Sequence, residues 1–329
     1  MSNTIPSQAN TSERPPRVIF LGMASNFSHP SLRALLAAGV NVCAVIQPAA
    51  PGDIDAPALR RREPQGRRRV LLQVHSSSLH TSVQQLAEER KIPLWEVSQT
   101  SDYSALNSLV SDYQPDLLCV ACFPYYLPPP LLRIPPLGVL NVHPSLLPAN
   151  RGPEPLFWTF RLGLERTGVT IHQMNEVLDS GEIIAQESLE VPEGISYAEL
   201  EAQTAELGGK LLVQAVADLA NGRAKPRPQD ESASSYYPYP SNVRGREDFV
   251  IHPEEWDARH VYNFICGVKD WGEPLTLVAD AELTLEVEDV LIYSYKAHDL
   301  RLHTNERDAW PVRCKQGKVI VKGRPRRRP

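Results

Sequence analysis

The first part of the chain alternates short apolar runs with stretches in which leucine recurs at helical spacing. Residues 17–22 form an apolar run that ends in glycine, and residues 41–46, 117–123 and 138–143 are further runs of this kind. Between the runs, leucines three or four residues apart indicate the buried face of a helix. Short apolar strands that alternate with helices predict an α/β fold with a doubly wound, mostly parallel sheet. Ligands bind such sheets at the carboxyl ends of the strands.

The pattern changes after a long predicted helix. Ser196 and Glu199 form a capping box that marks its start, and Asn221-Gly222 marks its end. The next residues are polar and rich in proline, serine and tyrosine, which is typical of a linker. Short apolar runs behind one helical segment then predict a small β-rich domain. The expected organisation is a disordered arm over 1–16, a larger α/β domain over 17–222, a linker over 223–246, a β-rich domain over 247–322 and a basic tail over 323–329.

Composition places the chain among ordinary soluble globular proteins. It has 329 residues, of which 42% are hydrophobic and 22% are charged. No apolar run approaches the roughly 20 residues that a membrane span needs. The first residues are polar and proline-rich, without the apolar stretch of a secretory signal. Five cysteines, an odd number spread along the chain, argue against a disulfide framework. We therefore expect a cytoplasmic protein with no membrane partner.

Positive charge gathers in two places although the net charge is −5. One place lies in and just after residues 48–66, which their prolines predict to be a loop. The other is the C-terminal tail. Clustered arginines can bind a polyanion such as nucleic acid, because phosphate contacts supply most of its non-specific affinity. They can equally form a solvated loop and a frayed tail. The arginines of the first segment are Arg60, Arg61, Arg62, Arg67, Arg68 and Arg69.

Two common motifs are absent or weak. Cys119 and Cys122 have the CxxC spacing of redox and zinc sites. They lie in a predicted strand, however, where residues three apart point to opposite faces, so two buried apolar cysteines are expected instead. The turn over residues 22–27 carries one glycine, where a dinucleotide site needs three. A nicotinamide-dependent enzyme is therefore disfavoured.

The densest group of polar residues follows the predicted strand that ends at residue 143. Asn141 and His143 are two residues apart, so both side chains project from one face at the carboxyl end of that strand. Asp179 lies further along in a predicted turn. An amide and an imidazole can stabilise an oxyanion, and a carboxylate can assist proton removal from an attacking amine. These three residues are the candidate catalytic groups for acyl transfer to nitrogen.

Ser145 raises a second interpretation, that of a serine hydrolase. With His143 and Asp179 it supplies the three side-chain types of a catalytic triad. The chain lacks the G-x-S-x-G elbow around this serine. Ser145 also shares a face with Asn141 and His143 only if the strand continues past Pro144. The hydrolase is the weaker alternative.

Four motifs together resemble the formyltransferase family that uses 10-formyltetrahydrofolate. NVHPSLLP at 141–148, Arg-Gly at 151–152, GVTIHQM at 168–174 and LDSG at 178–181 occur in the order and at the spacing of that family. The resemblance implies formyl transfer from the folate to an amine, without a metal, and implies that Asn141, His143 and Asp179 are catalytic. It also implies two segments that line the donor pocket, namely Cys122, Phe123, Pro124, Tyr125, Tyr126 and Leu127, and Asn175, Glu176, Val177 and Leu178.

The resemblance also bears on the acceptor. A folate-binding domain, a PQDE linker at 228–231 and a small β-barrel are the layout of the members that formylate methionyl-tRNA for translation initiation. In those members a basic loop that meets the tRNA falls where this chain has the arginines of 60–69. Pro153 to Trp158 instead resembles the members that act on amino sugars or other small amines. Methionyl-tRNA is therefore the expected acceptor, and a nucleotide-linked amino sugar or other small amine is the alternative. A third possibility is a non-catalytic folate- or RNA-binding module.

Overall fold

The computed structural model describes residues 14–50, 58–63, 82–98, 103–243, 246–280, 282–296 and 308–326. Within them no helix is long and apolar enough to cross a membrane. The chain forms two compact units. The N-terminal unit comprises Met1–His143, Val169–Glu187 and Thr204–Glu231, and the C-terminal unit comprises Pro144–Gly168, Ser188–Gln203 and Ser232–Pro329.

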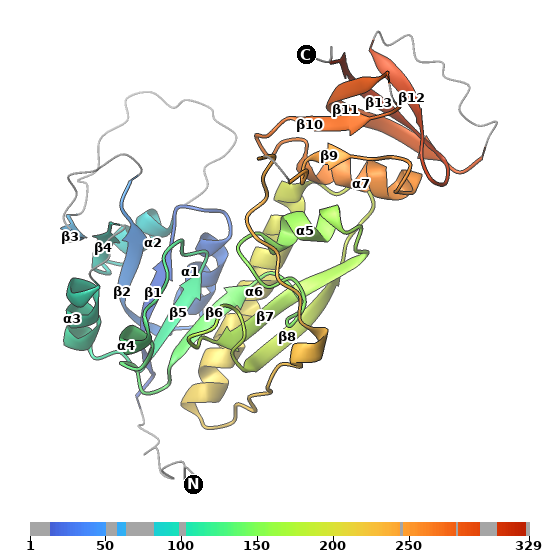
Figure 1. Ribbon diagram of the computed structural model, residues 1–329. Helices are drawn as coiled ribbons and strands as arrows, with labels where there is room; N and C mark the ends of the chain where they lie inside the picture. Colours follow the sequence, from blue (N-terminus) through green and yellow to red (C-terminus); the bar gives the residue numbers. More distant parts are fainter. Residues whose placement is uncertain are drawn as a thin grey trace. The chain divides into compact units, whose positions relative to one another are not determined.

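The N-terminal unit is built on an eight-stranded sheet of order β3-β4-β2-β1-β5-β6-β7-β8 (Figure 1). The pairs β4–β2, β2–β1, β1–β5 and β5–β6 are parallel, and the pairs β3–β4 and β6–β7 are antiparallel. The α/β fold with a mostly parallel sheet is thus confirmed. Its strands are β1 (Arg17–Gly22), β2 (Asn41–Pro48), β3 (Leu59–Arg62), β4 (Leu94–Val97), β5 (Leu117–Ala121), β6 (Val139–His143), β7 (Arg166–Gln173) and β8 (Ile183–Glu190).

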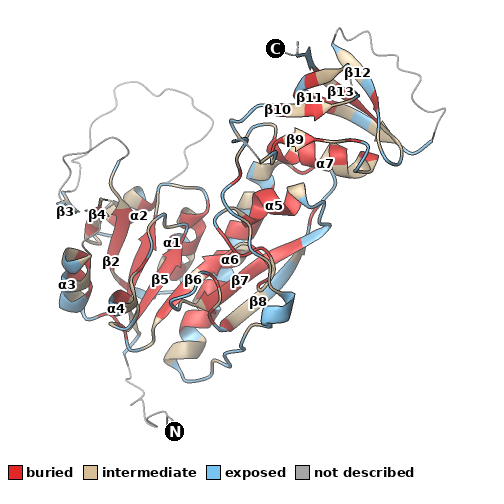
Figure 2. Ribbon diagram, in the orientation of Figure 1, coloured by how far each residue is buried: buried red, intermediate tan, exposed pale blue. Residues whose placement is uncertain are grey.

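Helices flank this sheet, and their apolar faces form two separate cores with it. The helices are α1 (Ser28–Ala37), α2 (Val83–Glu89), α3 (Ser104–Tyr113), α4 (Pro129–Leu132) and α6 (Tyr197–Ala220). Val18 and Phe20 of β1 are buried in a core with residues of α1, α2 and α6. Ile19 and Leu21 are buried in a second core with residues of α3 and α4. Alternate residues of one strand thus face two apolar cores, which is why the strand reads as a continuous apolar run. The neighbouring strands β2 and β5 are likewise largely buried, as the red ribbon in Figure 2 shows.

Strand β3 corrects the predicted loop at 48–66. Arg60 lies opposite Glu96 in the antiparallel β3–β4 register. The guanidinium groups of Arg60 and Arg62 both bind the Glu96 carboxylate, because residues two apart in a strand share a face. The sequence LRRR can therefore form an edge strand, because two of its arginines pair with a buried glutamate. The local sequence pattern does not reveal this partner.

The C-terminal unit contains a five-stranded sheet of order β12-β13-β11-β10-β9. Phe157 of its helix α5 packs against Phe249 and Phe264 in an aromatic core. The predicted small β-rich region is thus confirmed. Its elements are α5 (Pro155–Arg161), β9 (Val250–Ile251), α7 (Ala258–Val268), β10 (Leu275–Val278), β11 (Thr284–Ser294), β12 (Ala309–Arg313) and β13 (Lys318–Pro325), and a 3-10 turn, η1 (Glu231–Ala233), spans the unit boundary.

The two units differ in extent from the predicted continuous domains. Residues 144–168 and 188–203 group with the C-terminal unit, and residues 223–231 of the predicted linker group with the N-terminal unit. The aromatic face of α5 explains the first difference, because its partners lie about a hundred residues later in the chain. Strand β13 also runs to Pro325, into the predicted basic tail. The arm over 1–16 lies outside the described residues except for 14–16, as do residues 327–329.

Candidate active site

Asn141 and His143 lie at the carboxyl end of β6, as the strand pattern predicts. Strand β7 runs antiparallel beside them, with His172 opposite Asn141 and Thr170 opposite His143. The Asn141 amide nitrogen lies 3.1 Å from Nε2 of His172. His143 and His172 are both buried, with their ring centroids 6.2 Å apart. The antiparallel register therefore adds a second imidazole to the predicted pair.

Asp179 completes this group from the turn between β7 and β8. Its Oδ1 lies 3.8 Å from Nδ1 of His143 and 3.6 Å from Nε2 of His172. Asp179 itself is 7% exposed, so its carboxylate faces the two imidazoles in a largely water-excluded place. The structure thus brings together the three candidate catalytic residues of the sequence. One amide, two imidazoles and one carboxylate can stabilise a developing oxyanion and hold the proton that an amine releases.

His172 is the residue that the sequence patterns missed. It lies inside the GVTIHQM motif, but nothing local to that motif distinguishes it from a structural histidine of an apolar strand. Only the pairing of β6 with β7 places its ring beside Asn141 and Asp179. An antiparallel alignment of the two motifs, with NVH read against TIH, is the signal that would have found it.

The segment after β5 carries the first predicted donor-binding residues. Cys122 leaves the strand in a left-handed conformation, with a φ of 54°, and is exposed. The prediction that both CxxC cysteines are buried is therefore wrong for Cys122, because β5 ends one residue before it. Cys119 remains in the strand, where burial raises the pKa of its thiol. Tyr126 is 56% exposed and Leu127 is buried.

The second predicted donor-binding segment is a loop that is stabilised by hydrogen bonds to the side chain of Asn175. Oδ1 of Asn175 accepts hydrogen bonds from the Val177 backbone N–H at 3.0 Å and from the Ser180 hydroxyl at 2.9 Å. Glu176 forms an ion pair with Arg133. Val177 is 62% exposed and Leu178 is 52% exposed. Two apolar side chains presented to solvent on a hydrogen-bonded loop suit contact with a planar ligand.

Ser145 does not occupy a nucleophile's position. Strand β6 ends at His143, so Ser145 does not continue its face. Its buried hydroxyl donates a hydrogen bond to the Ala149 carbonyl at 2.7 Å. The hydrolase interpretation therefore loses its geometric basis.

The arginine segment is partly engaged inside the N-terminal unit. Glu96 is 2% exposed, and its carboxylate accepts hydrogen bonds from Arg60, Arg62 and the Gln47 amide. Burial raises the pKa of Glu96, but the hydrogen bonds from the two arginines outweigh it and hold that pKa below its usual value. Arg61 is exposed, whereas Arg67, Arg68 and Arg69 lie outside the described residues. Contact of this segment with tRNA stays a prediction.

Glu154 is a titratable group within the segment Pro153 to Trp158. It is half-buried before α5, and the Tyr197 hydroxyl donates to its Oε2 at 3.2 Å. Burial raises the pKa of Glu154 to about 7, and the Tyr197 hydrogen bond offsets only part of this. The carboxyl group is therefore protonated in the folded protein at a pH where it is charged in the unfolded chain.

Replacing Glu154 with glutamine is expected to stabilise the protein at pH 8 by up to about 3 kcal/mol, and by much less at pH 5. Because the folded-state pKa is raised, the wild type loses stability as the pH rises from about 4.5 to about 7, whereas glutamine carries no proton to lose. Urea unfolding at both pH values measures this difference. Glu190→Gln, at an exposed acid, is the control, and equal effects at pH 5 and pH 8 would contradict the assignment.

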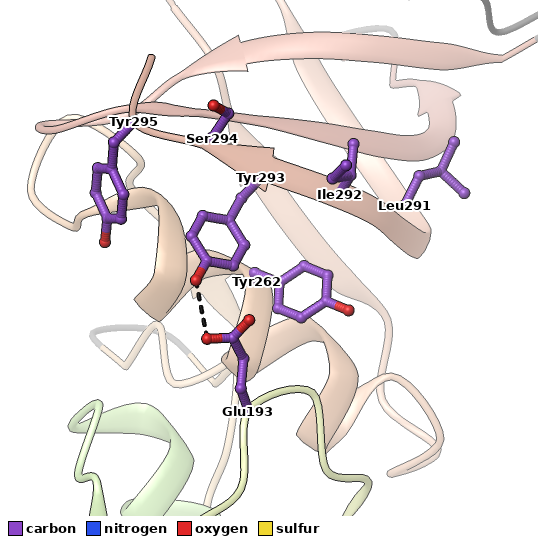
Figure 3. Close-up of a pocket in the computed structure, with 7 residues that line it drawn as sticks. All are labelled: Glu193, Tyr262, Leu291, Ile292, Tyr293, Ser294 and Tyr295. Carbon is purple, nitrogen blue, oxygen red and sulfur yellow. Dashed lines mark hydrogen bonds between the residues drawn. The ribbon is translucent and has the colours of Figure 1, made fainter. Parts of the chain in front are cut away.

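A cavity of about 330 Å³ in the C-terminal unit contains none of the predicted site residues (Figure 3). Tyr262 of α7 and Tyr293 of β11 line it with their rings 5.3 Å apart. The Tyr293 hydroxyl donates to Glu193 at 2.9 Å, as the dashed line in Figure 3 marks. Burial and this carboxylate raise the pKa of Tyr293 to about 12.

Comparisons with known proteins agree with the motifs. Residues 58–216 match a family model described as Formyl transferase. The chain is 36% identical to a methionyl-tRNA formyltransferase of Syntrophus aciditrophicus over 252 residues, which cover 76% of this chain and 72% of that protein. It is 32% identical to a methionyl-tRNA formyltransferase of Bacillus velezensis over 306 residues, which cover 93% and 85%.

One solved structure shows how far the fold extends. It is an N-formyltransferase from Helicobacter canadensis in complex with folinic acid and dTDP-3-aminofucose. The TM-score is 0.64 at 14% identity, and the match covers 94% of this chain and 100% of that one. At this identity the likeness supports a shared fold and nothing finer.

Proposed function

Because the chain belongs to the formyl transferase family, we propose that it transfers the formyl group of 10-formyltetrahydrofolate to the amino group of methionyl-tRNA. The relatives that match most of the chain are named methionyl-tRNA formyltransferase, which supports this acceptor. The observation that carries the proposal is the convergence of the half-buried Asn141 with the buried His143, His172 and Asp179 in the N-terminal unit. Residues of these types at these distances suit attack on a carbonyl by an amine.

The reaction needs charge stabilisation and movement of one proton. The neutral amine attacks the formyl carbon, and the carbonyl oxygen becomes an oxyanion. The Asn141 amide and the His143 imidazole donate hydrogen bonds to that oxygen. Asp179, 3.8 Å from His143 Nδ1, orients the imidazole and takes up the proton that the attacking nitrogen releases. The intermediate collapses when the carbon–N10 bond breaks, and N10 of the folate leaves with the proton that Asp179 took up from the amine.

His172 has an orienting role in this scheme. Its Nε2 lies 3.1 Å from the Asn141 amide nitrogen and 3.6 Å from Asp179 Oδ1. Nε2 accepts the N–H of the Asn141 amide and so orients it, whereas an acceptor nitrogen has no proton to donate to Asp179. The donor would lie against residues 122–127 and the Asn175 to Leu178 loop, whose exposed Tyr126, Val177 and Leu178 offer apolar surface.

The direct test offers labelled formyl donor to the enzyme with methionyl-tRNA, with uncharged tRNA and with dTDP-linked amino sugars. Label in the methionyl ester alone is the expected result. Label in the amino sugar alone would move the acceptor to a small amine, which the segment Pro153 to Trp158 favours. Absence of label in every acceptor would contradict a formyltransferase and leave a binding module.

Salt provides a second discrimination between the acceptors. If three tRNA phosphates are neutralised, affinity for methionyl-tRNA should fall about 40-fold between 50 and 200 mM salt, because counterions are released on binding. A small amine without a polyphosphate backbone should respond much less. KM for each acceptor, measured across this range, checks the expectation, and a flat KM for methionyl-tRNA would contradict phosphate-based binding.

A further inference from the structure

Asp179 lies in a turn that is unfavourable for its own backbone. Its φ is 53°, in the left-handed region that residues other than glycine rarely adopt. Two residues later, Gly181 lies so close to β7 that a Cβ there would sit 1.6 Å from the Gln173 carbonyl oxygen. The turn is thus pressed against the end of β7 while Asp179 bears a strained conformation. Such a conformation persists only where the surroundings hold it in place.

Gln229 contacts this turn from far along the chain. Its side-chain amide nitrogen donates to the Asp179 carbonyl at 2.8 Å and to the Gly181 carbonyl at 2.7 Å. A glutamine amide has two N–H donors, and both are used here. The two acceptors flank Ser180, so one side chain bridges both ends of the three-residue turn. This contact comes from a residue 50 positions after Asp179.

The backbone that carries Gln229 is itself attached to β8. Arg227 and Ile183 exchange both backbone hydrogen bonds, at 2.8 and 2.9 Å. The Arg227 guanidinium also donates to the Gln186 side chain at 3.1 Å. Gln229 lies two residues beyond this bridge, and all of these residues belong to the N-terminal unit. The segment predicted as a linker is therefore a fixed support for the turn.

We propose that Gln229 is a positioning residue for catalysis, which holds the Asp179 carboxylate opposite His143 and His172 through the backbone of the turn. The inference rests on the proposed role of Asp179. The carboxylate lies 3.6 and 3.8 Å from the two imidazoles, so a displacement of about 1 Å changes its place relative to both rings and to an attacking amine. Errors of this size in the placement of a catalytic group can cost about a hundredfold in rate.

The test compares Gln229→Glu and Gln229→Ala with a matched control. Glutamate keeps the shape of the side chain but replaces the amide donor with a negatively charged carboxylate, which cannot donate to the two carbonyls. Alanine removes the contact altogether. We expect kcat to fall about 10- to 100-fold in both variants, with KM for the folate and for the acceptor within about threefold of wild type. Gln214→Glu makes the same charge change at an exposed site on α6 and should leave kcat unchanged.

A double-mutant cycle separates positioning from a general structural effect. If Gln229 acts through Asp179, then Gln229→Ala should cause no further loss in an Asp179→Ala background. An equal loss in both backgrounds would overturn the proposal, and so would wild-type kcat in the folded Gln229 variants.

The role of Gln229 can be tested even if the proposed function is wrong. If the wild-type protein formylates no acceptor, the proposed function falls, and hydrogen exchange then tests Gln229 directly. We expect the backbone amides of residues 177–181 to exchange faster in Gln229→Ala than in wild type, with no change in Gln214→Glu. Unchanged exchange over these residues would overturn the inference even in an inactive protein.

Discussion

Replacing His143 with alanine is expected to lower kcat for formyl transfer about 10²- to 10³-fold. The imidazole lies at the end of β6 beside Asp179. In the proposed mechanism it supplies an oxyanion donor, and loss of one such donor costs about 3 kcal/mol of barrier. Asn141→Ala should produce a loss of the same order for the same reason. Because both residues act on the transition state, KM should change far less than kcat.

Single-turnover assays with labelled donor measure this loss independently of product release. His252→Ala is the matched control, because His252 is paired with Glu247 and Glu254 in the C-terminal unit and lies outside the predicted site. It should retain wild-type kcat. Wild-type turnover in His143→Ala would remove the mechanism proposed for this enzyme.

Replacing Glu96 with alanine is expected to destabilise the protein by about 2 kcal/mol at pH 7. The buried carboxylate accepts hydrogen bonds from Arg60, Arg62 and the Gln47 amide, and hydrogen bonds to a charged group contribute about 1.5–3 kcal/mol. The arginine side chains are 43% and 28% exposed, so water compensates part of the loss. The hydrogen bonds from these arginines lower the pKa of Glu96, so the stabilisation exists above the unfolded-state pKa and is lost as the pH falls through the folded-state value. The difference between wild type and variant should therefore shrink near pH 3.

Urea unfolding at pH 7 and pH 3 checks both parts of this prediction. Glu206→Ala is the control in the same unit, since Glu206 binds Arg33 on the surface with both side chains more than half exposed. Exposed pairs contribute about 0–1 kcal/mol. Equal destabilisation by the two substitutions would contradict the view that burial makes the Glu96 cluster important.

The catalytic strand shows what local sequence can predict. An apolar run of five residues predicts β6, and the two-residue period places Asn141 and His143 on one face. The sequence also indicates Asp179 as a candidate, and its Oδ1 lies 3.8 Å from Nδ1 of His143, while the catalytic role of the three residues stays a prediction. No local pattern indicates His172, because its place opposite Asn141 depends on which strand pairs with β6 and in what register.

Other features depend on partners that are remote in the sequence. The segment Leu59–Arg62 reads as a loop until Glu96 of β4 is placed beside it. The linker reads as a polar connection until Gln229 reaches the turn of Asp179. The sequence pattern places α5 in the larger domain, whereas its aromatic side chains pack with α7 and Phe249.

Apolar periodicity and motif spacing by themselves determined the class of the fold, the position of strand β6 and the candidate catalytic residues at its end. These follow from short-range geometry, since the period of a strand or helix fixes which neighbouring side chains share a face. Only the tertiary structure decided that a second histidine joins the site, that a glutamine supports its aspartate and that two arginines share a buried glutamate. Hydrogen bonds and ion pairs of this kind act over a few ångströms between residues that can be fifty positions apart, and no local pattern encodes them.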